Sequence, residues 1–311
     1  MKHAAPARRS FPLAGAALAC LAALSAAGPA QAESGDVLKK IKDSGEITLG
    51  YREASIPFSY LGGDAQPIGY SIDLCNRVVD AVKKELKLPN LKVNLQAVTS
   101  QNRIPLVQNG TVTLECGSTV NNAERQPLVG FSVTTFVVAT RFVGRKAAHQ
   151  KTVDDLKGRT VAVTTGTNTV KRVRELNEAR KLGMTLVNGK DHAESMLLVT
   201  SGRADAFFED DILLTGMAAS SQTPGDFALS TEGYSVDPYA LMFAKGDPEF
   251  KRLVDGTLKG LFASGDINRI YDKWFTRPIP PKNIVLNFPM GATLKQVIAK
   301  PTDSPDAADY K

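Results

Sequence analysis

Two parts of the chain repeat the same order of short apolar strands and amphipathic helices, and this order constrains the fold more than any other feature. An alternating strand at 46–52 precedes a helix at 71–87, in which apolar residues recur at helical spacing. The elements that follow are a strand at 91–99, a short helix at 103–110 and a strand at 111–116. Strand–helix–strand units of this kind form parallel sheets with helices on their faces, so we expect an α/β fold.

The later part of the chain changes character. After a β-rich stretch, a second α/β unit spans about residues 142–230. Two amphipathic helices at 247–265 and 266–275 follow, and the proline-rich segment 276–289 is expected to be extended. The closing residues 301–311 have few apolar side chains, so we expect a flexible tail there.

One internal echo points to a ligand site. The segments LVQNGTVTLECGS and LVTSGRADAFFED both read as a helix end, a glycine and a strand. Eight residues beyond the glycine lies Ser118 in the first segment and Asp210 in the second. Both follow the carboxyl end of a strand, where open α/β sheets bind ligands. If a rough two-fold axis relates the two units, Ser118 and Asp210 face each other across a cleft. The alternative is that the two segments are unrelated, because the order helix, glycine, strand recurs in any α/β protein.

Residues 1–32 have the pattern of a secretory signal peptide. A basic start precedes an apolar run at 11–27, and Ala30, Gln31 and Ala32 provide a small-residue cleavage site after Ala32. The apolar run is short for a membrane span. A twin-arginine export signal and a lipoprotein signal ending at Cys20 remain alternatives. We therefore expect a periplasmic protein.

Several function classes lack their signatures. Removing residues 1–32 removes three cations and no anions, so the formal net charge falls from +6 to +3, and no basic stripe with interleaved aromatics suggests a nucleic-acid partner. A GxSxG elbow, a Walker A loop and a GxGxxG fingerprint are absent, so nothing indicates an enzyme. Only His149 and His192 remain beyond the leader, without CxxC or HxxxH spacing, so we expect neither a metal nor a cofactor.

Two cysteines, Cys75 and Cys116, remain after the leader. An exported protein meets an oxidising compartment, where one disulfide is plausible. Two buried thiols are an equal alternative, because a sequence does not give the Cα separation that a bridge needs.

Cationic and hydroxyl side chains gather where strands or helices are expected to end. They are Arg52, Ser100, Arg103, Ser118, Thr119 and Arg125, together with Thr164, Thr167 and Asn168 in the turn VTTGTNTV. An arginine binds a carboxylate through two parallel hydrogen bonds, and a turn that opens a helix presents N–H groups to an anion. Each arginine alone fits a solvated surface role better. Together they predict a site for a molecule with more than one negative group.

Asp210 and His192 refine this prediction. Three arginines around a small anion leave excess positive charge unless it is matched, and a carboxylate at the facing strand end can hold a cation of the ligand. Two carboxylates and one ammonium describe an acidic amino acid. For His192, either Asp191 caps the helix and leaves the imidazole in solvent, or the imidazole donates to a ligand carboxylate.

A family likeness runs in order from about residue 36 to residue 290. The segments that carry it include REASIPFSY, VTSQNRIPLVQNGT, LECGSTVNNAERQ, KDHAES, SGRADAFFEDD and YDKWFTRPIPPKN. They resemble the periplasmic glutamate/aspartate-binding proteins of ABC importers. The resemblance implies that Arg125 binds the ligand α-carboxylate with Ser118 and the turn at 164–168, and that Asp210 binds the α-ammonium. It places four residues around the side-chain carboxylate: Arg52, Ser100, Arg103 and His192. Asn168 stands where the family commonly has threonine.

The resemblance also implies a two-lobed type II periplasmic binding protein fold, with two crossing segments near 136–141 and 230–239. The first lobe would comprise 36–137 and 238–300, and the second 138–237. Capture of L-glutamate or L-aspartate would proceed by lobe closure on a monomer, which then delivers the ligand to the membrane subunits of an ABC permease. Three alternatives remain. They are a binder of another anion, an enzyme of this fold, such as a cyclohexadienyl-acid dehydratase, and a ligand-sensing ectodomain, which would need an anchored or multidomain chain.

Overall fold

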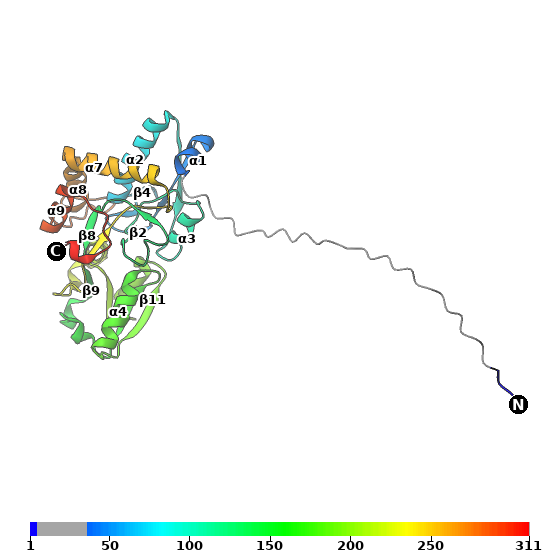
Figure 1. Cartoon of the computed structure of the whole chain (residues 1–311). Coiled ribbons are helices and arrows are strands. Elements are labelled where there is room, and N and C mark those ends of the chain that lie inside the picture. Colours follow the sequence, from blue (N-terminus) through cyan, green and yellow to red (C-terminus); the bar gives the residue numbers. More distant parts are fainter. Residues whose placement is uncertain (5–35, 311) are drawn as a thin grey trace. The chain divides into compact units, whose positions relative to one another are not determined.

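A computed structural model of the chain describes residues 1–4 and 36–310 (Figure 1). The described residues 36–310 belong to one compact unit, which contains all the elements below. The expected signal peptide and its cleavage after Ala32 lie outside the described residues, except for residues 1–4. None of the helices in the described part of the chain is long and apolar enough to cross a membrane.

The first lobe contains a five-stranded sheet. Its strands, in order across the sheet, are β5 (Lys92–Ala97), β1 (Glu46–Tyr51), β6 (Leu114–Glu115), β15 (Met242–Phe243) and β7 (Gly130–Phe131). The helices of this lobe are α1 (Val37–Ser44), α2 (Tyr70–Leu86), α3 (Arg103–Gln108), α7 (Pro248–Ser264), α8 (Asp266–Phe275) and α9 (Ala292–Ala299). A small antiparallel sheet follows β1, formed by β2 (Ala54–Ser55), β3 (Ser59–Leu61) and β4 (Pro67–Ile68).

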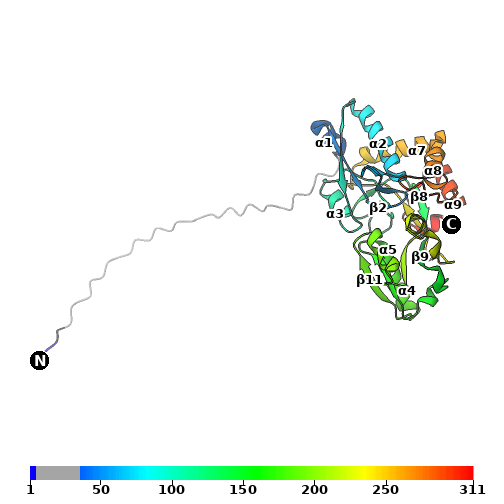
Figure 2. The ribbon, with the colours of Figure 1, turned by 180° about the vertical axis from the view of Figure 1, so that it is seen from behind.

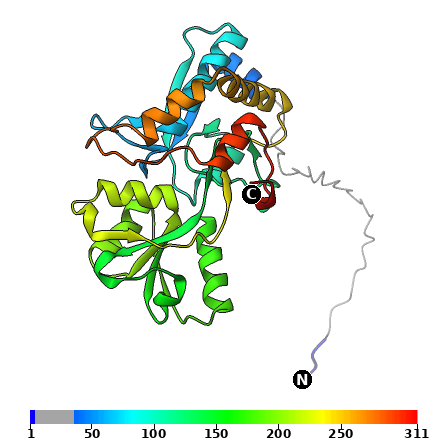
Figure 3. The same cartoon turned by 90° about the vertical axis from the view of Figure 1, so that its left-hand side faces the viewer.

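The second lobe, green to yellow in Figure 3, contains another five-stranded sheet. Its strands are β11 (Thr185–Gly189), β10 (Thr160–Thr164), β12 (Ala206–Asp210), β9 (Thr140–Arg145) and β13 (Phe227–Leu229). The helices α4 (Asn168–Ala179), α5 (His192–Thr200) and α6 (Asp211–Ser220) pack against it (Figure 2). Short 3₁₀ turns at η1 (Lys146–Ala148), η2 (Val153–Leu156) and η3 (Pro224–Asp226) complete this lobe.

Both sheets are mixed, whereas the sequence predicted mostly parallel sheets. In the first lobe β1 runs parallel to β5 and β6, but β15 runs antiparallel to β6 and β7. In the second lobe β10 runs parallel to β11 and β12, but β9 runs antiparallel to β12 and β13. The reason is the connection between the lobes. The strands β9 and β15 follow directly from the crossing strands, without the helical crossover that makes neighbouring strands parallel.

Two crossing strands, β8 (Phe136–Val138) and β14 (Asp237–Tyr239), pair antiparallel and connect the two sheets. Aromatic packing holds them to the first lobe. The ring centroid of Phe136 lies 4.9 Å from that of Phe275, and Tyr239 lies 5.1 Å from Phe58. Such pairs contribute about 0.5–1.5 kcal/mol each beyond their buried area. The crossing strands are therefore firmly anchored at one end.

Helix α7 shows how local sequence sets an element. Asp247 accepts a hydrogen bond from the Phe250 N–H at 2.8 Å, Pro248 occupies the first turn, and Gly265 ends the helix in the left-handed conformation. The apolar stripe expected from the sequence faces the core; its members Phe250, Val254, Leu258 and Leu261 are buried.

The prediction of a flexible tail at 301–311 is wrong for residues 301–310. A short turn, η4 (Ala307–Tyr310), buries Tyr310, whose hydroxyl lies 2.7 Å from Thr134 Oγ1. The Thr134 N–H also donates to the carbonyl of Thr302 at 2.8 Å, and Asn121 donates to the carbonyl of Asp303 at 2.9 Å. The tail is ordered by contacts with distant residues, although its own sequence is polar.

Candidate functional site

The candidate site lies where the central strands of both sheets end. Arg52 follows β1, Ser118 follows β6, Thr164 ends β10 and Asp210 ends β12. Each of these side chains is buried. Because parallel strands end at one edge of a sheet, their loops gather at that edge, which is the usual ligand position in open α/β sheets. The sequence-predicted residues of both lobes are thus brought together.

Arg52 links the lobes. Its backbone N–H donates to Ser59 Oγ at 2.8 Å, and its Nη2 lies 3.4 Å from His192 Nε2. Its Nη1 is buried and has no hydrogen-bond partner among the described residues. Burial, followed by the positive charge of Arg103, lowers the pKa of Arg52 to about 10, so the guanidinium remains charged at neutral pH.

Arg103 begins α3 and is held by a relay within the first lobe. Its Nη1 donates to Thr119 Oγ1 and, at 3.4 Å, to the carbonyl of Ser118. The Thr119 hydroxyl donates in turn to Glu115 Oε2 at 2.6 Å. Thr119, predicted as a ligand-binding residue, therefore uses its hydroxyl to connect Arg103 to a buried glutamate.

Arg125 also reaches across to the second lobe. Its Nη1 donates to the carbonyl of Val120 at 2.9 Å, and its Nη2 lies 3.5 Å from the carbonyl oxygen of Gly166. Burial and the neighbouring charge of Arg103 lower the pKa of Arg125 to about 9. The three arginines are thus buried and charged, and each is positioned by specific acceptors.

Several polar atoms in this cluster have no partner in the part of the chain that the structure describes. The donors are Arg52 Nη1, Arg103 Nε and Asn168 Nδ2; the hydroxyls are those of Ser100 and Ser118; and the acceptors are Glu115 Oε1, Glu209 Oε2 and Asp210 Oδ1. A buried polar group without a partner costs about 1–3 kcal/mol, so such a cluster marks a functional site. Its donors suit carboxylates, and its acceptors suit an ammonium.

Asp210 has one oxygen engaged and one free. Its Oδ2 accepts from the Tyr239 hydroxyl, whereas Oδ1 is unpartnered. Burial, then the nearby carboxylates of Glu209 and Asp237, raise the pKa of Asp210 well above its ordinary value. A ligand ammonium beside Oδ1 would counteract these effects, because an adjacent cation favours the ionised form.

His192 is buried, and its hydrogen bonds define its tautomer. Asp191 caps α5, as one of the two interpretations expected, but the imidazole does not lie in solvent. Ser195 Oγ donates its one proton to the carbonyl of Asp191 at 3.0 Å. In its contact with Thr164 Oγ1, at 2.8 Å, Ser195 is therefore the acceptor and the Thr164 hydroxyl is the donor. Thr164 Oγ1 then accepts from His192 Nδ1 at 3.0 Å, which leaves Nε2 to accept from Arg52.

The pKa of His192 agrees with this neutral form. Burial, followed by the charges of Arg52 and Arg103, lowers the pKa of the imidazole well below 6.5. The geometry therefore makes Nε2 of His192 an acceptor that orients Arg52.

The turn after β10 is satisfied mainly from within the second lobe. The Thr164 hydroxyl is engaged with Ser195 and His192, and the Thr167 hydroxyl donates to the carbonyl of Thr164 at 2.8 Å. Asn168, which begins α4, keeps a free amide nitrogen. Of the predicted side chains in this turn, Asn168 is thus the one with unused hydrogen-bonding capacity.

Gly166, in the same turn, allows the lobes to touch. Its φ is +81°, and a Cβ at this position would lie 2.5 Å from both Cα and N of Gln101 in the first lobe. Both the backbone conformation and the close approach require glycine.

Cys75 and Cys116 form a disulfide, with a Cα–Cα distance of 6.1 Å. The bond joins α2 to the segment that leads into Ser118. Nearby, Ser71 Oγ donates to the carbonyl of Gly117 at 2.7 Å. Together these links fix one loop of the site to the body of the first lobe.

Sequence reasoning missed three buried groups of the site: Glu115, Glu209 and Tyr239. Glu209 belongs to the run EDD, in which adjacent acids suggested a strand-end turn or helix start. The useful signal was its position at the same strand end as Asp210. Its Oε2 lies 3.4 Å from His192 Nδ1.

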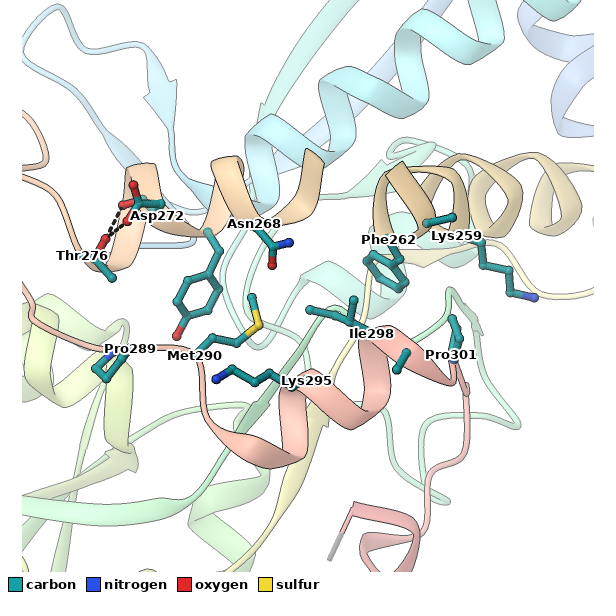
Figure 4. A pocket seen from close by; sticks show the side chains of 13 residues that line it. Lys259, Phe262, Asn268, Asp272, Thr276, Pro289, Met290, Lys295, Ile298 and Pro301 are labelled. Carbon is teal, nitrogen blue, oxygen red and sulfur yellow. Dashed lines mark hydrogen bonds between the residues drawn. The ribbon is translucent and has the colours of Figure 1, made fainter. Parts of the chain in front are cut away.

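A cavity of about 840 Å³ lies elsewhere, between α7, α8 and α9 (Figure 4). Phe262, Met290 and Ile298 contribute apolar walls. Two of its polar side chains already have partners: Asp272 accepts from Thr276, and the Tyr271 hydroxyl donates to the carbonyl of Phe288 at 3.0 Å. This cavity contains none of the predicted site residues and offers less binding chemistry than the arginine cluster.

Comparisons with known proteins give one consistent result. The bacterial extracellular solute-binding proteins, family 3, match residues 47–277. The L-glutamate/L-aspartate-binding protein of Pseudomonas aeruginosa is 53% identical over 286 residues, which cover 92% of this chain and 95% of the relative. The glutamate/aspartate import solute-binding protein of Escherichia coli is 44% identical over 287 residues, with the same coverage.

Solved structures show the same fold. A reconstructed ancestral amino acid-binding protein, described as a precursor of cyclohexadienyl dehydratase, has a TM-score of 0.65 and 25% identity. The alignment covers 77% of this chain and 99% of that one. The predicted two-lobed α/β fold is confirmed.

Proposed function

Because this chain belongs to the bacterial extracellular solute-binding proteins, family 3, we propose that it is the solute-binding component of an ABC amino-acid importer with L-glutamate or L-aspartate as its ligand. The observation that carries this proposal is the buried cluster of three arginines and Asp210, whose free hydrogen-bonding atoms match two carboxylates and one ammonium. The relatives with these ligands in their names are binding proteins and not enzymes.

The amino-acid end of the ligand would bind between Arg125 and Asp210. Arg125 supplies positive charge for the α-carboxylate, and the free hydroxyl of Ser118 supplies a further donor. Asn168 Nδ2 adds a donor from the second lobe. The free Oδ1 of Asp210 accepts from the α-ammonium, and Tyr239 holds the other oxygen. This arrangement uses both charges that every amino acid carries.

The side-chain carboxylate would bind between Arg52 and Arg103. Arg52 Nη1 and Arg103 Nε are the free donors, and the Ser100 hydroxyl is a third. His192 contributes by orienting Arg52. A glutamine ligand would leave one of these arginines without an anion, which costs several kcal/mol for a buried charge. The cluster therefore selects acidic amino acids.

Capture would proceed by rotation of one lobe, 138–237, against the other, 36–137 with 238–300, about the crossing strands β8 and β14. Closure removes water and strengthens the ion pairs around the ligand. The mature protein would act in the periplasm as a monomer after cleavage behind Ala32, and its closed form would dock on the permease subunits.

Calorimetric titration of the purified protein against L-glutamate, L-aspartate, L-glutamine and succinate tests this proposal. We expect tight binding of the two acidic amino acids and much weaker binding of glutamine and succinate. Arg52→Ala should reduce affinity for the acidic ligands by about 100-fold, equivalent to about 2.8 kcal/mol, and affect glutamine far less. Arg269→Ala, which removes an exposed arginine on α8, is the control. Equal losses for all ligands, or strong glutamine binding by the unmodified protein, would contradict the assignment.

A further inference from the structure

The buried site contains as many carboxylates as guanidiniums. Within the described part of the chain, Glu115, Glu209 and Asp210 accompany Arg52, Arg103 and Arg125, all of them buried. A fourth buried carboxylate, Asp237, lies near Asp210, but Arg172 pairs with it at 2.9 Å and balances its charge. His192 is neutral, as its hydrogen bonds require. With every carboxylate ionised, the six charges balance before a ligand enters. An acidic amino acid brings two carboxylates and one ammonium, so it adds one uncompensated negative charge to a buried site, which is costly.

In the occupied site, Glu209 is the carboxylate with the weakest support for its charge. Glu115 accepts a short hydrogen bond from Thr119, at 2.6 Å, and Asp210 would face the ligand ammonium. Glu209 Oε1 has only long contacts, 3.4 Å to Thr169 Oγ1 and 3.3 Å to the Asp210 N–H. Its Oε2 has no hydrogen-bond partner among the described residues.

Charged and titratable groups lie around Glu209 on several neighbouring elements, among them the Tyr239 hydroxyl of β14. Arg52 follows β1, Arg103 begins α3, His192 begins α5, and Asp210 is the next residue of β12. From α4, Thr169 contributes only a hydroxyl. On β9, Arg141 pairs with Glu209 in register, but its Nη1 donates to the carbonyl of Ser230 at 3.0 Å. Besides the Asp210 N–H, the ionised form of Glu209 is thus supported by Arg52 and Arg103, the two arginines that the ligand side chain would engage.

We propose that Glu209 takes up a proton when the protein binds its acidic ligand, so that the occupied site contains equal numbers of positive and negative charges. This inference rests on the proposed function. The side-chain carboxylate of the ligand places a negative charge beside Arg52 and Arg103. This charge offsets part of the stabilisation that the two arginines give to ionised Glu209, and it therefore raises the pKa of Glu209.

The free protein is suited to such a change near neutral pH. Burial raises the pKa of Glu209 to about 7, although the hydrogen bond from the Asp210 N–H and the charges of Arg52 and Arg103 oppose the shift. Since the ligand raises this pKa further, the protonated protein binds more tightly. The affinity for L-glutamate should change little at pH values up to about 6, where Glu209 is already largely protonated. It should fall as the pH rises above about 7, with a limiting slope of about tenfold per pH unit.

Titration calorimetry with L-glutamate in phosphate and in Tris measures the proton directly, because the two buffers have different ionisation enthalpies. At pH 8 we expect the apparent enthalpies to differ by an amount that corresponds to uptake of most of one proton. At pH 6 the difference should nearly vanish. Binding at pH 8 without a buffer-dependent enthalpy would overturn the proton uptake and leave the proposed ligand intact. Absence of binding to both L-glutamate and L-aspartate would overturn both proposals.

The variant Glu209→Gln assigns the proton to one residue. It imitates the protonated side chain, so it should lose the buffer dependence and bind L-glutamate at pH 8 roughly tenfold more tightly than the unmodified protein. Damage to the fold does not produce such a gain. If Glu209→Gln binds ligand and still takes up a proton, another group, such as His192, carries it and the assignment is wrong.

Discussion

The guanidinium of Arg52 has one nitrogen that is hydrogen-bonded within the protein and one that is free. His192 accepts from Nη2, whereas Nη1 has no partner among the described residues. A charged imidazole would repel the guanidinium, so the neutral form of His192 is essential to this arrangement. The chain of donors from His192 through Thr164 to Ser195 keeps the proton on Nδ1 and the lone pair toward Arg52.

Replacing His192 with alanine removes this acceptor. A lost partner of a buried guanidinium costs about 1–3 kcal/mol, and we expect the dissociation constant for L-glutamate to rise by roughly tenfold. The loss should be equal at pH 6 and pH 8 in a Glu209→Gln background, because the imidazole is uncharged across this range. Calorimetric titration measures both values.

A double-mutant cycle distinguishes positioning from direct contact. If His192 acts through Arg52, His192→Ala should cause little further loss in an Arg52→Ala protein. Additive losses would show that His192 contacts the ligand independently. His149→Ala provides the control, since His149 is exposed and far along the chain from the site residues.

The position of a site residue could be predicted from the sequence where the end of the preceding strand could be predicted. Arg52 and Asp210 follow alternating apolar segments, so their place at the edge of a sheet could be inferred before any contact was known. Glu115 and Glu209 have the same kind of position, but acids beside a strand end also suit a solvated turn. Their burial depends on packing between segments far apart in the sequence, which a local pattern does not contain.

At the scale of elements, the local signals worked where an element is stabilised by its own sequence. Helix α7, predicted as an amphipathic helix at 247–265, has its own cap, a proline in its first turn and a terminal glycine. The prediction of a flexible tail failed because residues far away in the sequence hold the tail in place. Residues 302–310 are bound by Thr134, Asn121 and Lys251. The sequence did not predict the antiparallel pairs in the two sheets for a related reason, since strand direction depends on how the chain crosses between lobes.

The tail should contribute to stability through Tyr310. This side chain is 2% exposed, and its hydroxyl bonds to Thr134 and to the carbonyl of Ser304. Tyr310→Ala removes a buried aromatic ring and should reduce the free energy of unfolding by about 2–4 kcal/mol, which lowers Tm by roughly 5–10 °C. Tyr310→Phe keeps the ring and should lose about 1 kcal/mol. Thermal and urea unfolding check these values; a Tm unchanged in both variants would mean that the tail is not docked in solution.

On the scale of the whole molecule, several polar contacts around the site join the two lobes. Arg52 reaches His192, Arg125 reaches the carbonyl of Gly166, and Lys171 of α4 pairs with Glu124. The repeated order of elements and the family likeness predicted two lobes and two crossings. They did not predict how closely the lobes approach, because that distance depends on backbone contact at Gly166 and Gln101.

Gly166→Ala should prevent this approach. The added Cβ would lie 2.5 Å from the backbone of Gln101, and backbone cannot move aside as a flexible side chain can. We expect affinity for L-glutamate to fall on the order of 100-fold, about 2.8 kcal/mol, with the ligand-bound radius of gyration remaining at its ligand-free value in solution scattering. Gly202→Ala is the matched control: Gly202 has a φ of +76°, but a Cβ there meets nothing within 4 Å. It should cost similar backbone strain and leave affinity unchanged. Equal affinity losses in both variants would assign the effect to strain in the second lobe, and closure would then not depend on contact at Gly166.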